Sequence, residues 1–244
     1  MKQVIYAGDW HGNFSYIKEE IIRRKIGNND EVSYIIQVGD FGIGFYPKKD
    51  IKELVELNKF FQKNNIICIV FRGNHDDPKY FNGDYIYSNL LLVPDYTVMD
   101  IYDKKHLFIG GAISIDRSAR INEMSISNSY GINDISYWVD EPFVLDIEKL
   151  KDIKNIDVLV THTAPHYCAP SALTKMVLDW IKRDNSLYYE LQKERDDMSM
   201  LIEILKNNSP NIESHFYGHF HFSATETIKG ITHHLLNINE FKCI

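Results

Sequence analysis

Five short motifs along this 244-residue chain bring together carboxylate, amide and imidazole side chains, which are common ligands of divalent metal ions. Seven of these side chains are candidate ligands: Asp9, His11, Asp40, Asn74, His162, His219 and His221. The set is large enough for two ions if one residue bridges them. Two ions about 3.5–4 Å apart generate a hydroxide nucleophile and clamp a phosphoryl group in line, so the sequence predicts two-metal chemistry.

The spacing within the motifs supports a common site. Asp9 and His11 lie two positions apart at a predicted strand end, so their side chains share one side of the chain. His219 and His221 repeat this spacing. Asp40 follows a glycine in a tight turn, where its two oxygens could each reach a different cation. The mixed nitrogen and oxygen donors suit Mn²⁺, Fe or Zn better than Ca²⁺, which prefers oxygen ligands only.

Strands and helices alternate in the first third of the chain and would position these motifs. The expected order is strand Val4–Ala7, helix Phe14–Ile26, strand Val32–Val38, a helix with Asp50 as its N-cap, and strand Ile66–Phe71. This β-α-β-α-β order predicts a parallel sheet, and each strand runs directly into a motif. The candidate ligands should therefore gather at the carboxyl ends of the strands.

The remainder of the chain predicts more strands and one long helical stretch. Leu90–Val93, Thr97–Tyr102 and Leu107–Ile109 are predicted to form a second sheet. Residues 112–142 lack a clear period and are interpreted as a functional loop or small cap on the substrate side. The further elements expected are strands Ile156–Val160 and Ser214–Tyr217, a helical stretch over 171–207 with a break near Arg183–Ser186, and a hairpin of Ala224–Ile228 with Ile231–Ile238. A single domain over residues 1–244 is expected.

Composition indicates a globular protein rather than a nucleic-acid or membrane protein. The apolar fraction is 44%, and the net charge of −7 argues against a dedicated nucleic-acid binder. No apolar run approaches the length of about 20 residues that a membrane span needs. Three cysteines are too few for a disulfide framework and are interpreted as reduced thiols. The chain begins directly with a strand, so a cytoplasmic location is expected.

From residue 9 to residue 221, the motif series resembles the calcineurin-like metallophosphoesterase superfamily. The resemblance implies an α/β fold, a four-layer α/β/β/α sandwich of two mixed sheets flanked by helices. It also implies two divalent metal ions, with Mn²⁺ favoured and Fe, Zn or Mg as alternatives. One ion would be held by Asp9, His11, Asp40 and His221, and the other by Asp40, Asn74, His162 and His219. His75 would donate a proton to the leaving oxygen or stabilise charge on the phosphoryl group, and Asp76 would act as its positioning partner.

The chain departs from one branch of that superfamily. Ile43 and Gly44 stand where the serine/threonine protein phosphatases carry an aspartate and an arginine, which places this chain outside that branch. The stretch from Gly110 to Arg117 resembles small microbial and phage members instead. The missing aspartate leaves open what orients His75, and the missing arginine leaves open what binds the phosphate. Arg117 or Arg120 is the candidate replacement, His166 is a candidate for the substrate pocket, and Arg72 is either a phosphate ligand or part of a structural salt bridge.

Three functions are compatible with these residues. The leading prediction is hydrolysis of a small phosphate ester, either a phosphomonoester, a phosphodiester or a nucleotide, by a hydroxide that bridges the metals. The second is a nuclease on the same scaffold, which requires a basic channel that the acidic composition does not favour. The third is a non-catalytic scaffold, which the complete set of candidate ligands and His75 argues against.

Overall fold

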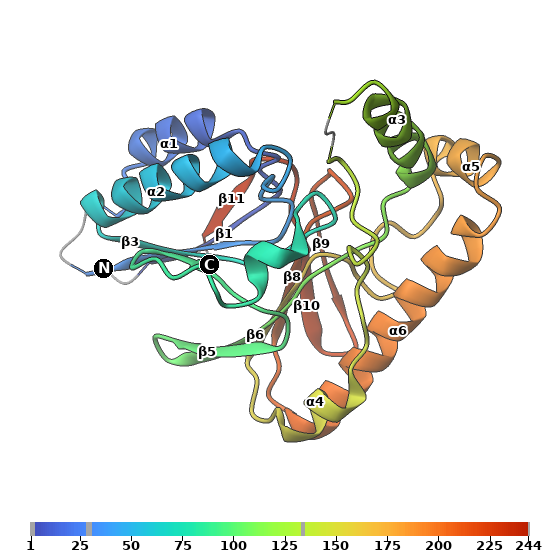
Figure 1. Cartoon of the computed structure of the whole chain (residues 1–244). Helices are drawn as coiled ribbons and strands as arrows, with labels where there is room; N and C mark the ends of the chain where they lie inside the picture. Colours follow the sequence, from blue (N-terminus) through green and yellow to red (C-terminus); the bar gives the residue numbers. More distant parts are fainter. Residues whose placement is uncertain (1–2, 28–30, 133–134, 244) are drawn as a thin grey trace.

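The computed structural model describes residues 3–27, 31–132 and 135–243. Two mixed β-sheets pack face to face, and helices cover their outer faces (Figure 1). The four-layer α/β/β/α arrangement predicted from the sequence is therefore confirmed.

The first sheet has the strand order β11-β1-β2-β3-β4. Its members are β1 (Gln3–Ala7), β2 (Ser33–Gln37), β3 (Ile66–Val70), β4 (Leu90–Leu92) and β11 (Phe241–Cys243). β1 to β4 run parallel to one another, whereas β11 pairs antiparallel to β1. The assignment of Leu90–Val93 to the second sheet was wrong. Leu90 pairs with Cys68 of β3 because Leu90 and Leu92 join the core beneath the helices of the first sheet.

The second sheet has the strand order β5-β6-β7-β8-β10-β9. Its members are β5 (Thr97–Ile101), β6 (Lys104–Ile109), β7 (Val158–Thr161), β8 (Ser214–Tyr217), β9 (Ala224–Ile228) and β10 (Ile231–Leu235). The strands β6, β7, β8 and β10 are parallel. β9 and β10 form the predicted antiparallel hairpin.

The helices cover both outer faces. α1 (Phe14–Arg23) and α2 (Pro47–Lys63) pack on the first sheet, where Ile17 and Leu54 join its core. α4 (Ile147–Asp152) and α6 (Leu187–Asn208) pack on the second sheet. α5 (Lys175–Ile181) precedes α6, so the predicted break in the helical stretch is confirmed. A short 3₁₀ helix, η1 (Pro78–Phe81), follows β3.

α2 begins at Pro47, so the prediction of Asp50 as its N-cap was wrong. Proline suits the first turn of a helix because the N–H that it lacks would have no partner there. Asp50 lies within that first turn, and its carboxylate accepts hydrogen bonds from Gly44 N at 2.8 Å and Tyr46 N at 3.1 Å. It therefore holds the loop that enters α2.

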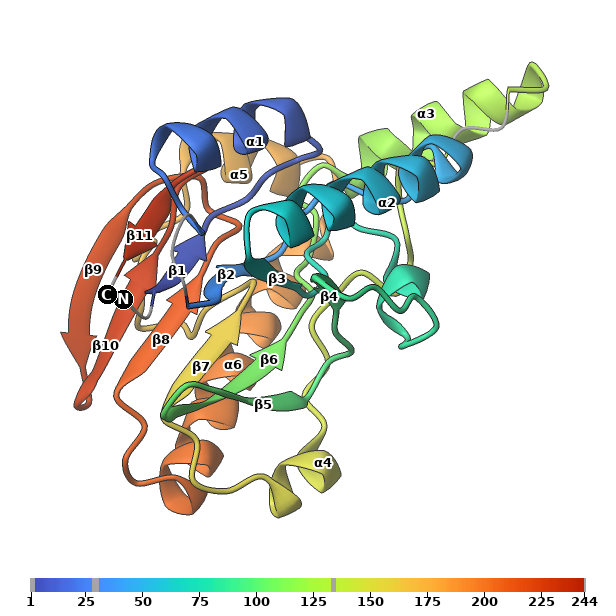
Figure 2. The ribbon, with the colours of Figure 1, turned by 90° about the vertical axis from the view of Figure 1, so that its left-hand side faces the viewer.

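The segment predicted as a loop or cap contains a helix, α3 (Arg117–Ser129). Figure 2 shows α3 projecting from the body of the molecule. Its only buried residue is Arg120, which explains why no apolar face marked the helix in the sequence. The role of this segment as a substrate-side cap stays a prediction.

The core between the sheets is formed by alternate residues of the facing strands. Ile36 and Ile69 of the first sheet pack with Phe108, Val160 and Phe216 of the second. A polar contact crosses this core, since Tyr6 Oη lies 2.8 Å from His106 Nε2. Within the described part of the chain, no helix is both long enough and apolar enough to cross a bilayer.

Candidate metal centre

The seven predicted ligands lie at the carboxyl ends of strands from both sheets. Those after β1, β2 and β3 are Asp9, His11, Asp40 and Asn74, and those after β7 and β8 are His162, His219 and His221. The structure brings the six carboxylate and imidazole ligands into two groups, within each of which the ligand atoms lie within 4.8 Å of one another. The first group is Asp9, His11, Asp40 and His221, and the second is Asp40, His162 and His219.

In the first group, ring nitrogens face each other and a carboxylate. His11 Nε2 lies 3.2 Å from His221 Nε2 and 3.8 Å from Asp40 Oδ2. His221 Nε2 lies 3.4 Å from Asp9 Oδ2. Asp9 is fully buried, and its carboxylate also accepts a hydrogen bond from the backbone N–H of His219 at 3.0 Å. This bond fixes the carboxylate beside the loop that carries two of the histidines.

Asn74 adds an amide oxygen beside the second group. Asn74 Oδ1 lies 3.0 Å from His162 Nε2 and 2.9 Å from His219 Nδ1. His162 Nδ1 lies 2.8 Å from the carbonyl oxygen of Val38 and can donate only to that acceptor. The Nε2 atom of His162 therefore points into the site, 3.1 Å from Asp40 Oδ1.

Asp40 belongs to both groups through different oxygens. Its Oδ1 lies beside His162 and accepts the backbone N–H of His75 at 2.7 Å, whereas its buried Oδ2 has no hydrogen-bond partner among the described residues. A buried carboxylate oxygen without a partner costs roughly 1–3 kcal/mol or more, and a bound cation would remove this cost. One oxygen per group is the arrangement of a bridging ligand. The residues present therefore fit two divalent ions.

The electrostatics of the site also favour positive charge. Burial opposes charge on His162, but the adjacent carboxylate of Asp40 raises its pKa to about 9. A metal ion between His162 and Asp40 would supply the positive charge that the proton on His162 otherwise provides, and it would bind the lone pair of the neutral imidazole. The donors are imidazole, carboxylate and amide groups, a set typical of transition metals rather than of Ca²⁺.

The backbone of the ligand loops is strained. His11, Asp40, His219 and His221 have φ values of 45°, 56°, 69° and 58°. This left-handed conformation costs a non-glycine residue about 1–2 kcal/mol. Such strain concentrates at functional sites, where the surrounding structure holds it. The strained backbone therefore lowers the local stability of the loops but orients these side chains toward one another.

Two glycines make room for the ligands. A Cβ atom at Gly73 would overlap the carboxylate of Asp40 and the ring of His162, and one at Gly218 would overlap the carboxylate of Asp9. Only a residue without a side chain lets the backbone approach the ligand atoms this closely. Close packing against the ligand side chains therefore explains why glycine precedes Asn74 and His219 in the motifs.

His75 and Asp76 follow Asn74 but occupy different surroundings. The ring of His75 packs edge-on against the ring of His11, with 5.0 Å between centroids, at the border of the first group. Asp76 is fully buried and accepts hydrogen bonds from the backbone N–H groups of Phe41, Gly42 and Gly73 at 2.7–3.0 Å. Its carboxylate therefore joins the loop after β2 to the loop after β3, which supports Asp40 and Asn74.

The three predicted substrate-binding residues are placed differently. Arg120 Nη2 lies 2.7 Å from His75 Nε2, so Arg120 lies at the cluster. Arg117 is committed to α6 and the turn before it, where it pairs with Asp184 at 2.8 Å and with Glu190. His166 lies beside α6 as well, 2.9 Å from Ser199 Oγ. Arg117 therefore anchors α3 to α6.

Of the two roles proposed for Arg72, a phosphate ligand or part of a structural salt bridge, the structure shows the salt bridge. Its guanidinium binds Asp95 Oδ2 at 2.8 Å and donates to the carbonyls of Asp140, Glu141 and Pro142 at 2.6–3.1 Å. These contacts clamp the end of the 112–142 segment beside the metal centre. Sequence reasoning missed this clamp because its partners are backbone carbonyls, which leave no pattern of residue types.

The aromatic residues near the ligand loops differ in how much of their surface is free. Trp10 is fully buried, and Trp138 is 9% exposed. Phe45 is half-buried, lies 6.5 Å from the ring of His75 between centroids, and packs edge-on against Trp138 at 5.0 Å. Phe45 therefore borders His75 with part of its ring surface free.

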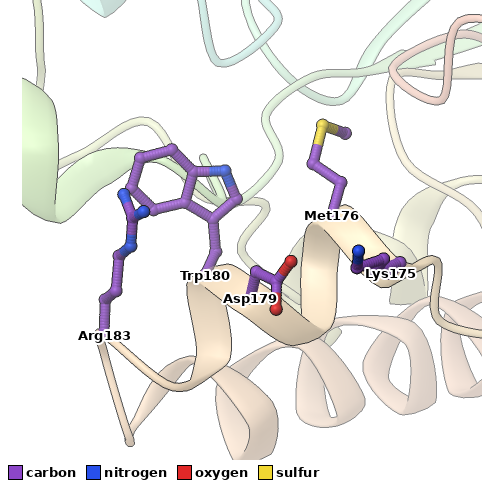
Figure 3. Close-up of a pocket in the computed structure, with 5 residues that line it drawn as sticks. All are labelled: Lys175, Met176, Asp179, Trp180 and Arg183. Carbon is purple, nitrogen blue, oxygen red and sulfur yellow. The ribbon is translucent and has the colours of Figure 1, made fainter.

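A separate hollow of about 380 Å³ lies on α5 (Figure 3). It is lined by Lys175, Met176, Asp179, Trp180 and Arg183. The guanidinium of Arg183 lies over the ring of Trp180, 4.7 Å from its centroid. These residues are distinct from the candidate ligands.

Comparison with known proteins gives one family match. A family model described as calcineurin-like phosphoesterase matches residues 2–223. No curated protein matches the chain at a significant level.

Similar solved structures include proteins from three sources. One is a candidate 5'-nucleotidase from Staphylococcus aureus, with 13% identity and a TM-score of 0.49 over 99% of this chain and 50% of that chain. Another is a phosphopantetheinyl hydrolase from Mycobacterium tuberculosis, with 11% identity and a TM-score of 0.48 over 98% and 90%. The third is the anchor in the inner membrane complex of Plasmodium, with 17% identity and a TM-score of 0.46 over 96% and 71%. This chain thus spans half the length of the Staphylococcus aureus protein.

Proposed function

The chain belongs to the calcineurin-like phosphoesterase family, and from this premise we propose that it hydrolyses a small phosphate ester with two divalent metal ions. Family membership supports a metal-dependent phosphoesterase activity. The proposal adds the number of ions, the residues that hold them and the class of substrate. One ion would be held by Asp9, His11, Asp40 and His221, and the other by Asp40, Asn74, His162 and His219. Mn²⁺ is the ion that we favour for this donor set, with Fe, Zn or Mg as alternatives.

The observation that carries the proposal is the division of Asp40 between the two groups. Its Oδ1 lies 3.1 Å from His162 Nε2, and its Oδ2, which has no hydrogen-bond partner among the described residues, lies 3.8 Å from His11 Nε2. Ions held on either side of this carboxylate would supply the positive charge and the water activation that phosphate ester hydrolysis requires.

The chain's own residues would position the phosphoryl group and the leaving group. His75 is tied to the bridging residue, since its backbone N–H donates to Asp40 Oδ1. We assign His75 either to proton donation at the leaving oxygen or to stabilisation of charge on the phosphoryl group. Arg120 presents its guanidinium beside His75 and would bind a phosphoryl oxygen, in place of the arginine that Gly44 replaces.

The surroundings of His75 favour a planar leaving group. Phe45 has a partly free ring beside His75 and is held edge-on by Trp138. An aromatic leaving group or a nucleoside could stack on this ring, and such stacking contributes about 1–3 kcal/mol. The net charge of −7 does not favour a polynucleotide. We therefore propose a nucleotide or an aryl phosphate ester, and a cytoplasmic location stays a prediction from the sequence.

The test is hydrolysis of p-nitrophenyl phosphate and bis-p-nitrophenyl phosphate with Mn²⁺ and with a chelator, for the wild type and for His75→Ala. We expect turnover that depends on metal and that His75→Ala lowers far more than it lowers bound metal. The preferred substrate separates monoesterase from diesterase activity. Equal loss of metal and turnover would contradict the role of His75, and a protein that binds no metal would contradict the whole proposal.

A further inference from the structure

The amide of Asn74 has different surroundings at its two ends. Its oxygen faces the second ligand group, 3.0 Å from His162 Nε2 and 2.9 Å from His219 Nδ1. Its nitrogen faces away and donates a hydrogen bond to Ser114 Oγ at 2.9 Å. Asn74 is 2% exposed, so water does not compete for either end. The direction of this amide therefore depends on Ser114.

Ser114 is in turn committed to Glu141. Its hydroxyl donates to Glu141 Oε2 at 2.9 Å, and its backbone N–H donates to Glu141 Oε1 at 2.7 Å. Both residues are buried, and Glu141 is fully so. Burial raises the pKa of Glu141 to about 7. In its ionised form the carboxylate only accepts hydrogen bonds, so the hydroxyl hydrogen of Ser114 then points to Glu141. The lone pairs of Ser114 Oγ are then left to accept from Asn74 Nδ2.

This direction matters because the two ends of an asparagine amide have nearly the same shape. Only the oxygen has a lone pair that can bind a cation, whereas the NH₂ group carries hydrogens that would face the ion. If Ser114 donated to Asn74 instead, the amide would turn over and present its nitrogen to the second group. While Glu141 is ionised, the hydrogen bonds from Asn74 to Ser114 and from Ser114 to Glu141 exclude this arrangement.

The backbone around Glu141 is held in place by Arg72 and Ala112. Arg72 donates to the carbonyls of Asp140, Glu141 and Pro142, and the backbone N–H of Ala112 donates to the Glu141 carbonyl at 3.2 Å. Arg72 is itself 7% exposed and paired with Asp95. The carboxylate therefore cannot move away from Ser114 without breaking a buried network.

We propose that Glu141 is a positioning residue that acts through Ser114 to hold the oxygen of Asn74 toward the second metal site. The inference rests on the proposed two-metal function, because it assigns Asn74 to one of the two ions. Partners behind metal ligands typically change metal affinity about 10- to 100-fold when they are replaced.

The test is titration of the metal-free protein with Mn²⁺, with the number of bound ions counted by calorimetry and their pairing followed by electron paramagnetic resonance. We expect two ions in the wild type. In Glu141→Gln, the second ion should bind about 10- to 100-fold more weakly. The introduced amide can donate to Ser114 Oγ, and the Ser114 hydroxyl can then donate to Asn74, which turns the amide over. Ser114→Ala should show the same loss. Glu148→Gln, at an exposed position of α4, is the matched control, since Glu148 pairs with Lys151 at the surface.

A second background separates positioning from general damage to the fold. In Asn74→Asp, both side-chain oxygens can bind a cation, so the direction of an amide no longer matters. The effect of Glu141→Gln on the second ion should therefore shrink in this background, as a double-mutant cycle would measure. Equal losses in both backgrounds, or two ions bound by Glu141→Gln with wild-type affinity, would overturn the inference alone. Fewer than two ions in the wild type would overturn the proposed two-metal function instead.

Discussion

Arg120 and His75 come from different elements and meet at the border of the metal centre, where Arg120 Nη2 lies 2.7 Å from His75 Nε2. The guanidinium belongs to a residue that is 7% exposed, and it is held by Asp116 Oδ1 at 3.1 Å and by the carbonyl of Ser136 at 2.9 Å. A phosphoryl group next to His75 would therefore meet a fixed positive charge whose donors are already oriented.

Replacement of Arg120 tests this role. Arg120→Gln removes the charge, and loss of a hydrogen bond to a charged group costs about 1.5–3 kcal/mol, so kcat/KM should fall roughly 10- to 100-fold. Bound metal should stay at the wild-type level, because Arg120 is not a ligand. Arg183→Gln, in the turn after α5, is the control and should leave kcat/KM unchanged. An unchanged kcat/KM in Arg120→Gln would remove this arginine from the substrate site.

Phe45 should affect substrates according to their leaving groups. Phe45→Ala removes the ring beside His75, and KM for p-nitrophenyl phosphate or a nucleotide should rise by about 10-fold, in line with a stacking contribution of about 1–3 kcal/mol. KM for glycerol phosphate should change little, because its leaving group has no ring. Tyr46→Ala, at an exposed neighbouring position, is the control. An equal change for both kinds of substrate would argue against stacking on Phe45.

Gly73 should not tolerate even one added methyl group. In Gly73→Ala, the new Cβ would overlap the carboxylate of Asp40 and the ring of His162, so the bridging ligand would be displaced. We expect loss of bound Mn²⁺ and of turnover while the circular dichroism spectrum keeps its folded shape. Gly131→Ala is the control, because open space surrounds Gly131 and the strain from its φ of 75° falls at the end of α3, away from the ligands. Full metal binding by Gly73→Ala would show that the ligand loops can shift without harm.

His106 should make the fold sensitive to acid, independently of the metal centre. Burial lowers the pKa of His106 from 6.5 to about 4. Between pH 6.5 and pH 4 the unfolded chain binds a proton that the folded chain does not, so stability falls as the pH falls. The loss over this window is roughly 3 kcal/mol.

Urea unfolding of the metal-free protein at pH values of about 7 and about 5, on either side of the ordinary histidine pKa, measures this effect. His106→Gln lacks the titrating ring and should lose less stability between these two pH values than the wild type does. The same loss in both proteins would mean that other buried groups cause the acid sensitivity.

Much of the fold was predictable because its signals are local. The apolar strands of the first third and the motif after each one indicated a parallel sheet with ligands at one edge, and the structure places Asp9, Asp40 and Asn74 there. The hairpin around Lys229 and Gly230 was predictable for the same reason.

The contacts around the site were not predictable, because they join distant residues without a periodic pattern. α3 buries only Arg120, so no apolar stripe marked the helix or its approach to His75. Glu141 meets Ser114 across 27 positions, in a segment without a hydrophobic period. The predicted pocket residues Arg117 and His166 contact Glu190 and Ser199 of α6, since a basic residue near a motif says nothing about which residue folds against it.

The ligand loops come from both sheets, and this division has a thermodynamic consequence. Each ion would join loops of one sheet to loops of the other, so that separating the layers would require releasing it. By mass action, an ion at a free concentration of about 100 times its Kd stabilises the folded state by about 2.7 kcal/mol for each site. The melting temperature should therefore rise with Mn²⁺ concentration and drop on chelation. In a cell, the fraction of the protein that is folded would then depend on the concentration of available metal.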